Sequence, residues 1–180
     1  GVYDFALLLD DIQAYFQHKA DGAQFASYAE AHAALCNRVY DWLQALDPAC
    51  TLCMCPTDYH GEPTAYLSEL GARLHSDINM FYTGLSVCAP SIAAAEMRQF
   101  AQTTGRKPLL WDNYPVNDLA MKDEMHIGPI QQRDPAMLDE VAGVFVNLMI
   151  QPEASKVPLL TYADFMDAPT QYDAENSWIT

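Results

Sequence analysis

The sequence predicts an α/β fold with a parallel β-sheet, and three observations support this prediction. Short apolar runs of strand length alternate with longer segments of helical periodicity. The connections between them are short, which favours right-handed crossovers between neighbouring parallel strands. The first apolar run is nearly continuous, as is typical of a strand that is covered on both faces. We therefore expect one parallel sheet in a single domain spanning residues 1–180.

Each predicted strand is a short apolar run that ends in polar residues. The first run is bounded by Asp10-Asp11, and we expect it to be buried on both faces. Pro56 ends the second run, and Asn147 follows the last. The predicted strands cover residues 2–9, 49–55, 79–82, 108–111 and 143–146.

The helices are predicted from spacing and from their end signals. Pro90 is placed in the first turn of one helix, with Gly105 beyond its end, and Asp134-Pro135 opens another. Pro158 should break or kink a later helix. The predicted helices cover residues 23–46, 64–74, 90–102, 135–142, 151–166 and a stretch beginning near 173. Apolar residues that recur at helical spacing in the first are Phe25, Tyr28, Ala29, Leu35, Val39, Trp42, Leu43 and Leu46.

Composition excludes several classes of protein. The 180 residues include 9 Lys and Arg against 24 Asp and Glu, so the formal charge is −15, which argues against direct binding of nucleic acid. Apolar residues make up 51% of the chain, too many for a disordered segment. No apolar run approaches the roughly 20 residues that span a bilayer. No signal peptide is apparent, and the start resembles the interior of a protein. We therefore expect a fragment and assign no compartment.

Asp10 and Asp11 form the sharpest local feature. Adjacent carboxylates repel each other, so one can keep a proton and act as a general acid while its neighbour stays ionised. Two carboxylates could instead hold Mg²⁺, or simply cap a helix. The sequence alone leaves these three interpretations open.

The long loop after the fourth strand has the side chains that a sugar pocket requires. The indole of Trp111 can cover the apolar side of a pyranose ring, and Asn and Asp side chains between residues 112 and 118 can bind its hydroxyls. No glycine-rich phosphate loop is present. Cys50, Cys53 and Cys55 invite a metal interpretation, but no second Cys or His pair completes a tetrahedral site. Buried strand thiols are favoured, and we expect no metal and no cofactor.

Read in order, the strand-end motifs resemble glycoside hydrolase family 84, the family of protein O-GlcNAcases and bacterial β-N-acetylglucosaminidases. The matching segments extend over nearly the whole chain. They are FALLLDDI (5–12), CPTDY (55–59), YTG (82–84), LLWDNYPVND (109–118), IGP (127–129) and GVFVN (143–147). The resemblance implies a (β/α)8 TIM-barrel catalytic domain, of which this chain would cover roughly strands 4 to 8, the C-terminal five-eighths.

The resemblance also implies a retaining mechanism assisted by the substrate. The 2-acetamido oxygen of a terminal β-linked N-acetylglucosamine would attack the anomeric carbon and form an oxazoline, without a metal or organic cofactor. Asp10 would polarise the acetamido group, and Asp11 would act as general acid and base. The substrate-binding residues implied by position are Tyr59, Trp111, Asn113, Asp118 and Asn147.

The chain departs from the family pattern at its start. The three βα units that precede the acidic pair in the family, with a glycine and a lysine that reach the sugar, have no counterpart in the nine residues before Asp10. One alternative is therefore a catalytically incomplete sugar-binding fragment, and a second is a magnesium-dependent barrel lyase that uses Asp10-Asp11. Open barrel edges would favour self-association between copies of this chain. The other expected partner is the substrate, a glycoprotein or glycoside that carries N-acetylglucosamine.

Overall fold

The computed structural model describes residues 1–179, with the backbone alone at Ala120. Thr180, the last residue of the predicted domain, lies outside the described residues. Within them, five parallel strands form one sheet in chain order, which confirms the predicted α/β class. The strands are β1 (Asp4–Leu8), β2 (Thr51–Cys55), β3 (Asn79–Tyr82), β4 (Leu109–Asp112) and β5 (Gly143–Val146).

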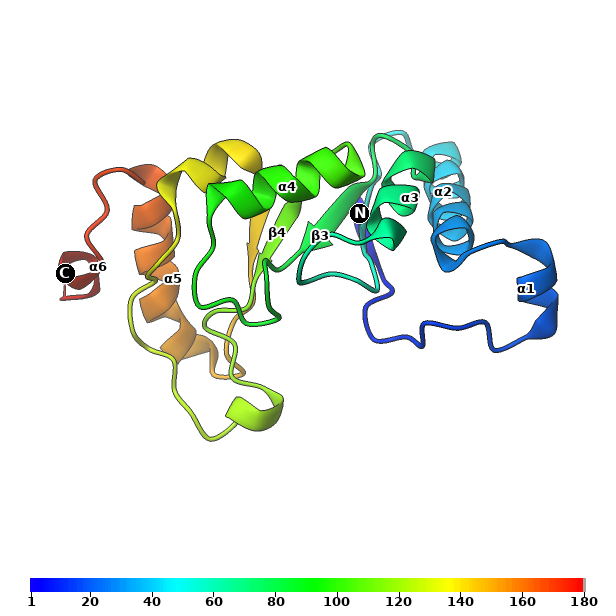
Figure 1. The fold of residues 1–180 in the computed structure, drawn as a ribbon. Helices are drawn as coiled ribbons and strands as arrows, with labels where there is room; N and C mark the ends of the chain where they lie inside the picture. The colour runs from blue at the N-terminus through cyan, green and yellow to red at the C-terminus, as the bar shows by residue number, and fades with distance from the viewer. Residues whose placement is uncertain (180) are drawn as a thin grey trace.

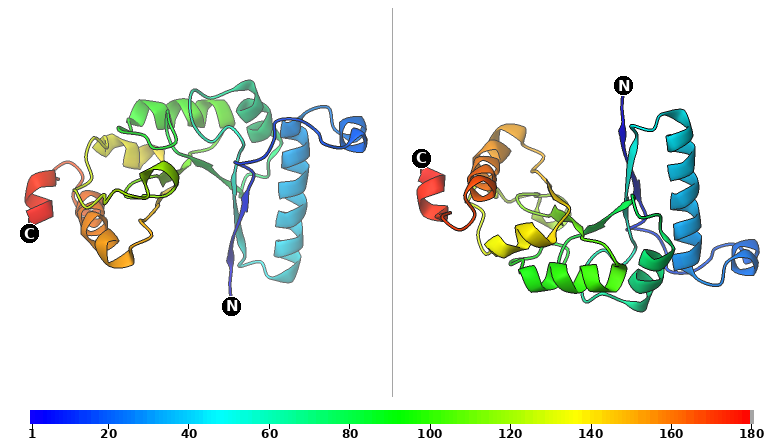
Figure 2. Two further views of the ribbon diagram at one scale, coloured as in Figure 1. Left: turned by 90° about the horizontal axis from the view of Figure 1, so that it is seen from below. Right: turned by 90° about the horizontal axis from the view of Figure 1, so that it is seen from above.

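The longer helices lie around the outside of this sheet (Figure 1). Seen from below and above, they follow an arc around the outside of a curved sheet, as in part of a barrel (Figure 2). The α-helices are α1 (Lys19–Gln24), α2 (Tyr28–Leu46), α3 (Ala65–Arg73), α4 (Ala94–Thr104), α5 (Pro152–Asp167) and α6 (Ala174–Ile179), and the 3-10 helices are η1 (Leu119–Met121) and η2 (Pro135–Glu140). In the described part of the chain, no helix is both long and apolar enough to cross a membrane.

Side chains alternate between the two faces of each strand. On the face toward the helices, Met54, Met80 and Leu110 are fully buried in the main core. The concave face carries a smaller cluster in which Phe81 meets Trp111 and Phe145 edge to face, with ring centroids 5.0 and 5.2 Å apart. The core therefore lies between the sheet and the helices.

The prediction that the first strand is buried on both faces is wrong. Phe5 is 36% exposed and Leu8 is 51% exposed. β1 has only β2 as a neighbour in the described sheet, and the five strands do not close around the concave face. A barrel strand carries an apolar sequence, but its burial depends on neighbours that these five strands do not supply.

The helix predicted over residues 23–46 is two helices. The chain is extended at Phe25, and α2 begins at Tyr28, because the Ser27 side chain accepts a hydrogen bond from the Glu30 amide at 3.1 Å. Leu35, Trp42 and Leu46 of the predicted apolar face are exposed. The helix instead packs through a narrower seam formed by Ala29, Ala33, Cys36 and Leu43.

Two further boundaries differ from prediction. Helix α4 begins at Ala94 rather than Pro90, because Ile92 pairs with the 132–134 segment: its amide donates to Gln132 at 3.0 Å, and its carbonyl accepts from Asp134 at 2.9 Å. Helix α5 continues through Pro158, so the predicted break does not occur. The short helix after Asp134 is 3-10 in form.

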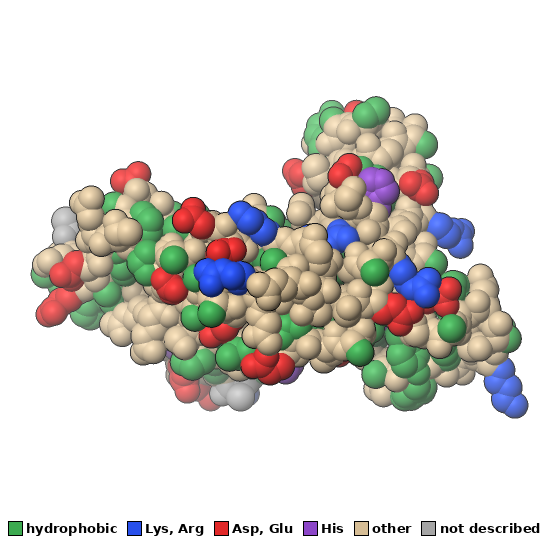
Figure 3. Space-filling model, turned by 45° about the horizontal axis from the view of Figure 1, so that its top comes forward, with side chains coloured by type: hydrophobic (Ala, Val, Ile, Leu, Met, Phe, Trp, Pro, Cys, Tyr) green, Lys and Arg blue, Asp and Glu red, His purple; other side chains and the backbone are tan. Residues whose placement is uncertain are grey.

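Helices α3 and α4 approach closely at Gly71. A Cβ atom there would overlap the carbonyl oxygen of Thr104. Arg106, which follows α4, then donates to four carbonyls at and beyond the end of α3, including Gly71 at 2.9 Å and Ile78 at 2.7 Å. A glycine and an arginine thus fix how the two helices cover the sheet. On the face shown in Figure 3, acidic and basic side chains are interspersed among uncharged ones.

Candidate active site

A pocket of about 220 Å³ opens at the carboxyl ends of the strands. In parallel α/β proteins this edge of the sheet is where sites are built. The pocket is lined by every residue that the sequence placed in the site: Asp10, Asp11, Tyr59, Trp111, Asn113, Asp118 and Asn147. Side chains spread over 138 positions of sequence thus come together around one cavity.

The acidic pair is presented just beyond β1. Asp10 is half-buried and Asp11 is exposed. Leu9, which precedes them, donates its amide to the carbonyl of Cys55 at 2.9 Å and so extends the pairing of β1 with β2. Neither carboxylate makes a hydrogen bond or ion pair with the described residues. Both therefore remain available to a ligand.

The two carboxylates set the electrostatics of the pocket. Burial, together with the charges of Asp10 and Asp11, raises the pKa of the Cys55 thiol to about 12. Burial likewise raises the pKa of Tyr59, again with contributions from both aspartates. The Tyr59 hydroxyl therefore stays protonated at neutral pH and can donate a hydrogen bond. A negative field of this kind stabilises positive charge that develops beside it.

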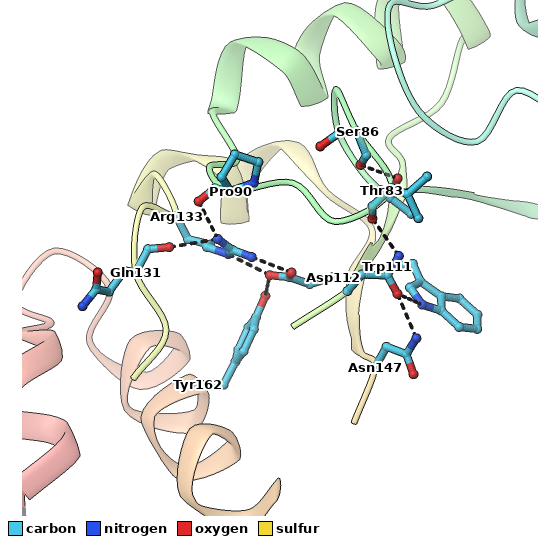
Figure 4. A network of polar contacts seen from close by, with 11 residues as sticks. Thr83, Ser86, Pro90, Trp111, Asp112, Gln131, Arg133, Asn147 and Tyr162 are labelled. Atoms are coloured by element: carbon cyan, nitrogen blue, oxygen red, sulfur yellow. Dashed lines mark hydrogen bonds and ion pairs between the residues drawn. The ribbon is translucent and has the colours of Figure 1, made fainter. Parts of the chain in front are cut away.

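One wall of the pocket is a hydrogen-bonded group of polar side chains (Figure 4). The Asn113 Oδ1 atom accepts from the indole Nε1 of Trp111 at 3.1 Å and from Nδ2 of Asn147 at 2.8 Å. Its own Nδ2 donates to the carbonyl of Val87 at 2.7 Å. These bonds orient three predicted sugar contacts from β4, β5 and the loops after them.

Asp112, between Trp111 and Asn113, points the other way. Its carboxylate forms a bidentate pair with Arg133, at 2.6 and 2.8 Å, and accepts from the hydroxyl of Tyr162 at 2.8 Å (Figure 4). The residue is 1% exposed. Asp112 is therefore a buried structural anion that joins β4 to α5 and to the loop before η2.

The loop that carries Asp118 is held by Asn117, which the sequence analysis had included among the possible ligands of sugar hydroxyls. Asn117 is fully buried, and its Nδ2 donates to the carbonyl of Glu124 at 2.9 Å and to Oε1 of Gln151 at 2.8 Å. Its Oδ1 accepts from the amide of Ile150 at 3.1 Å. A complete set of amide partners distinguishes this asparagine from a sugar contact, but only the tertiary structure reveals them.

Further residues line the pocket that were not among the predicted contacts. Cys55 and Thr83 lie inside the recognised motifs, so the strand-end pattern could have indicated them. Val87 and Cys88 come from the loop before α4 and carried no sequence signal. All five cysteines are free, and Cys50 and Cys55 are buried. In the described ranges, no three His, Cys, Asp or Glu side chains gather as a metal ligand set, so the magnesium interpretation rests on the acidic pair alone.

Solved structures define the class of fold. A variant of the O-GlcNAc hydrolase of Thermobaculum terrenum superposes with a TM-score of 0.96 at 38% identity, over 99% of this chain and 39% of that chain. A structure described as CpGH84B gives a TM-score of 0.84 at 30% identity, over 99% and 31%. The curved sheet with its outer helices is therefore part of a TIM barrel of the glycoside hydrolase type.

The sequence comparisons agree. The family model for β-N-acetylglucosaminidase matches residues 1–180, so the chain belongs to the β-N-acetylglucosaminidase family. The protein O-GlcNAcases of Rattus norvegicus and Mus musculus are each 30% identical to it over 170 residues. That alignment covers 91% of this chain but only 18% of each relative. The resemblance to glycoside hydrolase family 84 is confirmed.

Proposed function

We propose that this chain supplies the catalytic pocket of a retaining exo-β-N-acetylglucosaminidase. Its substrate is terminal β-linked N-acetylglucosamine, including that carried on Ser or Thr of proteins. The observation that carries the proposal is the convergence of Asp10, Asp11 and the predicted sugar contacts on one pocket. Family membership and the names of the relatives support the same chemistry.

Asp10 and Asp11 have different roles in the reaction. Asp10 accepts a hydrogen bond from the acetamido N–H, which makes the acetamido oxygen more nucleophilic and stabilises the cationic oxazolinium that forms when it attacks the anomeric carbon. Asp11 gives its proton to the departing glycosidic oxygen and later takes one from the water that opens the ring. The protonated hydroxyl of Tyr59 donates to the acetamido oxygen as that group is oriented for attack.

The other wall binds the sugar. The indole of Trp111 offers an apolar face, held in place through its bond to Asn113. Asn113 and Asn147 present amide groups, and Asp118 presents an exposed carboxylate for the distal hydroxyls. A neutral sugar does not require a basic protein surface, which fits the acidity of the chain.

Leaving-group dependence tests the role of Asp11. In the complete encoded protein, Asp11→Ala should lower kcat/KM on a poorly departing alkyl N-acetyl-β-glucosaminide by about 10²–10⁴-fold. A dinitrophenyl glycoside should lose much less in the glycosylation step, because its leaving group needs no proton. Equal activity of variant and wild type on the alkyl glycoside would show that Asp11 is not the acid.

The internal nucleophile has its own test. Fluorine on the acetamido methyl withdraws electrons from the carbonyl oxygen, so successive fluorination should slow hydrolysis progressively. The matched control is a hexosaminidase that uses a carboxylate nucleophile, in which the same series has a small effect. Insensitivity of this protein to fluorination would count against substrate assistance.

A further inference from the structure

We propose that Thr57 is a positioning residue for the acidic pair: its hydroxyl fixes the peptide immediately before Asp10. This inference rests on the function proposed for the same pocket and extends it to a residue outside the pocket lining. Thr57 lies in the loop after β2, between Cys55 and Tyr59.

The pairing of β1 with β2 changes at this point. The last paired residues are Leu8 and Cys55, and the Leu9 amide then donates to the Cys55 carbonyl at 2.9 Å. In a regular parallel ladder, the amide of Thr57 would next donate to the carbonyl of Leu9. Here the Thr57 Oγ1 hydroxyl makes that bond instead, at 2.8 Å. A side chain thus completes the last rung before the acidic pair.

The displaced amide has another partner. The Thr57 amide donates to the hydroxyl oxygen of Tyr66 at 3.3 Å, and that hydroxyl lies 2.9 Å from Nδ1 of His32. Burial raises the pKa of Tyr66 to about 12 and lowers the pKa of His32, so the phenol keeps its proton and the imidazole is neutral at pH 7. Through these contacts the Thr57 amide is linked, by way of Tyr66, to His32 in α2.

The positions of Asp10 and Asp11 depend more on the hydrogen bond between Thr57 and Leu9 than on contacts of their own side chains. Within the described residues, the side chains of Asp10 and Asp11 make no hydrogen bonds. The Leu9 peptide is held on both sides, through its amide to Cys55 and through its carbonyl to Thr57. Without the hydroxyl, the carbonyl side is released one residue before Asp10. Catalytic groups must be held within about 0.5 Å, and a displacement of about 1 Å can cost 100-fold in rate.

The test compares three variants of the complete encoded protein on an alkyl N-acetyl-β-glucosaminide. Thr57→Val keeps the shape of the side chain and removes the hydroxyl, and it should lower kcat by about tenfold or more with little change in KM. Thr57→Ser keeps the hydroxyl and should restore kcat to near the wild-type value. Thr103→Val is the matched control, because Thr103 donates to the Gln99 carbonyl at 3.1 Å within α4, away from the pocket.

The outcomes separate this inference from the proposed function. If the wild type hydrolyses the glycoside and Thr57→Val does so with the same kcat, Thr57 does not position the pair. If the wild type hydrolyses no N-acetylglucosaminide, the proposed function fails, and this inference fails with it. If Thr57→Val does not fold, Thr57→Ala is compared with Thr57→Ser below both melting temperatures. A loss of kcat confined to Thr57→Ala supports the proposal, and equal kcat overturns it.

Discussion

The two faces of the sheet differ in what they stabilise. Toward the helices, Met54, Met80 and Leu110 are fully buried, and even a carboxylate, Asp112, is enclosed and paired. Toward the concave side, Leu8 and Phe145 are about half exposed, at 51% and 50%. The helix side thus holds the packing that defines the fold. The concave side and its rim hold apolar and acidic groups that the described residues leave open.

The segment 111–113 shows how one strand end serves both faces. Trp111 and Asn113 turn to the pocket, whereas Asp112 turns to Arg133 and Tyr162. All three residues are of types that occur in sugar-binding sites. Strand alternation, not residue type, decides which of them meets a ligand.

The largest expected effect on stability is at Asp112. Asp112→Ala leaves Arg133 buried without its counter-charge, which should lower the free energy of unfolding by about 3–5 kcal/mol. Urea unfolding of the complete encoded protein measures this. Asp139→Ala, at an exposed position in η2, is the control and should change it by no more than about 0.5 kcal/mol. If both substitutions lowered the free energy of unfolding equally, the buried pairing of Asp112 with Arg133 would not stabilise the fold as described.

A core substitution on the helix side comes next. Leu110→Ala removes a fully buried side chain and should cost about 2–5 kcal/mol, because the surrounding core cannot close the cavity completely. Leu46→Ala, at an exposed position near the end of α2, should cost far less. The same denaturant titrations compare them, and a similar loss at both sites would contradict the burial described for Leu110.

Close helix packing predicts a smaller loss at Gly71. Gly71→Ala would place a methyl group against the Thr104 backbone, so α3 and α4 must separate at a cost of about 1–3 kcal/mol. Gly22→Ala in α1 meets only the Phe16 side chain, at 3.5 Å, and should be neutral or stabilising. Thermal unfolding of both variants sharpens the contrast; a stabilised Gly71→Ala would show that the helices are not in close contact.

The smallest effect is pH-dependent. The Glu124 carboxylate, 2.9 Å from Nε2 of His126, is the main cause of the raised pKa of that imidazole. A side chain whose pKa is higher in the folded than in the unfolded state stabilises the fold fully at pH values below its unfolded-state pKa. That stabilisation is lost as the pH rises through the folded-state pKa. Glu124→Gln should therefore destabilise the protein more at about pH 5.5 than at about pH 8. NMR titration should show a lower His126 pKa in the variant, and an unchanged pKa would contradict the assignment.

The strands and the edge of the sheet that carries the pocket were predictable from local sequence, whereas the choice of individual sugar contacts came from the family resemblance. Apolar runs mark the strands, and the residue after each run lies at one edge of a parallel sheet, so Asp10, Tyr59 and Asn147 could be placed together. The direction in which a side chain points at that edge could not be predicted from local sequence. The structural role of Asp112 depends on Arg133 and Tyr162, which are 21 and 50 residues away.

The incorrect or missing predictions share one cause, because each depends on contacts that the local apolar pattern does not show. The start of α2 is fixed by the Ser27 cap, and its core seam includes Ala33 and Cys36, two small side chains that the predicted apolar face omitted. β1 has the composition of a buried strand, but burial requires neighbours. Thr57 gave no signal because its hydroxyl acts on the carbonyl of Leu9, 48 positions away. The open concave face leaves the expected self-association as a prediction for light scattering.

The most direct test of the catalytic pocket is the rate of hydrolysis by the Asp10→Asn variant of the complete encoded protein. The substitution keeps the size of the side chain and removes the negative charge that the acetamido group requires. Hydrolysis of an aryl N-acetyl-β-glucosaminide should fall by about 10²–10³-fold or more, with the melting temperature unchanged, because the Asp10 carboxylate makes no hydrogen bond with the described residues. Hydrolysis at the wild-type rate would contradict the assignment of the pocket.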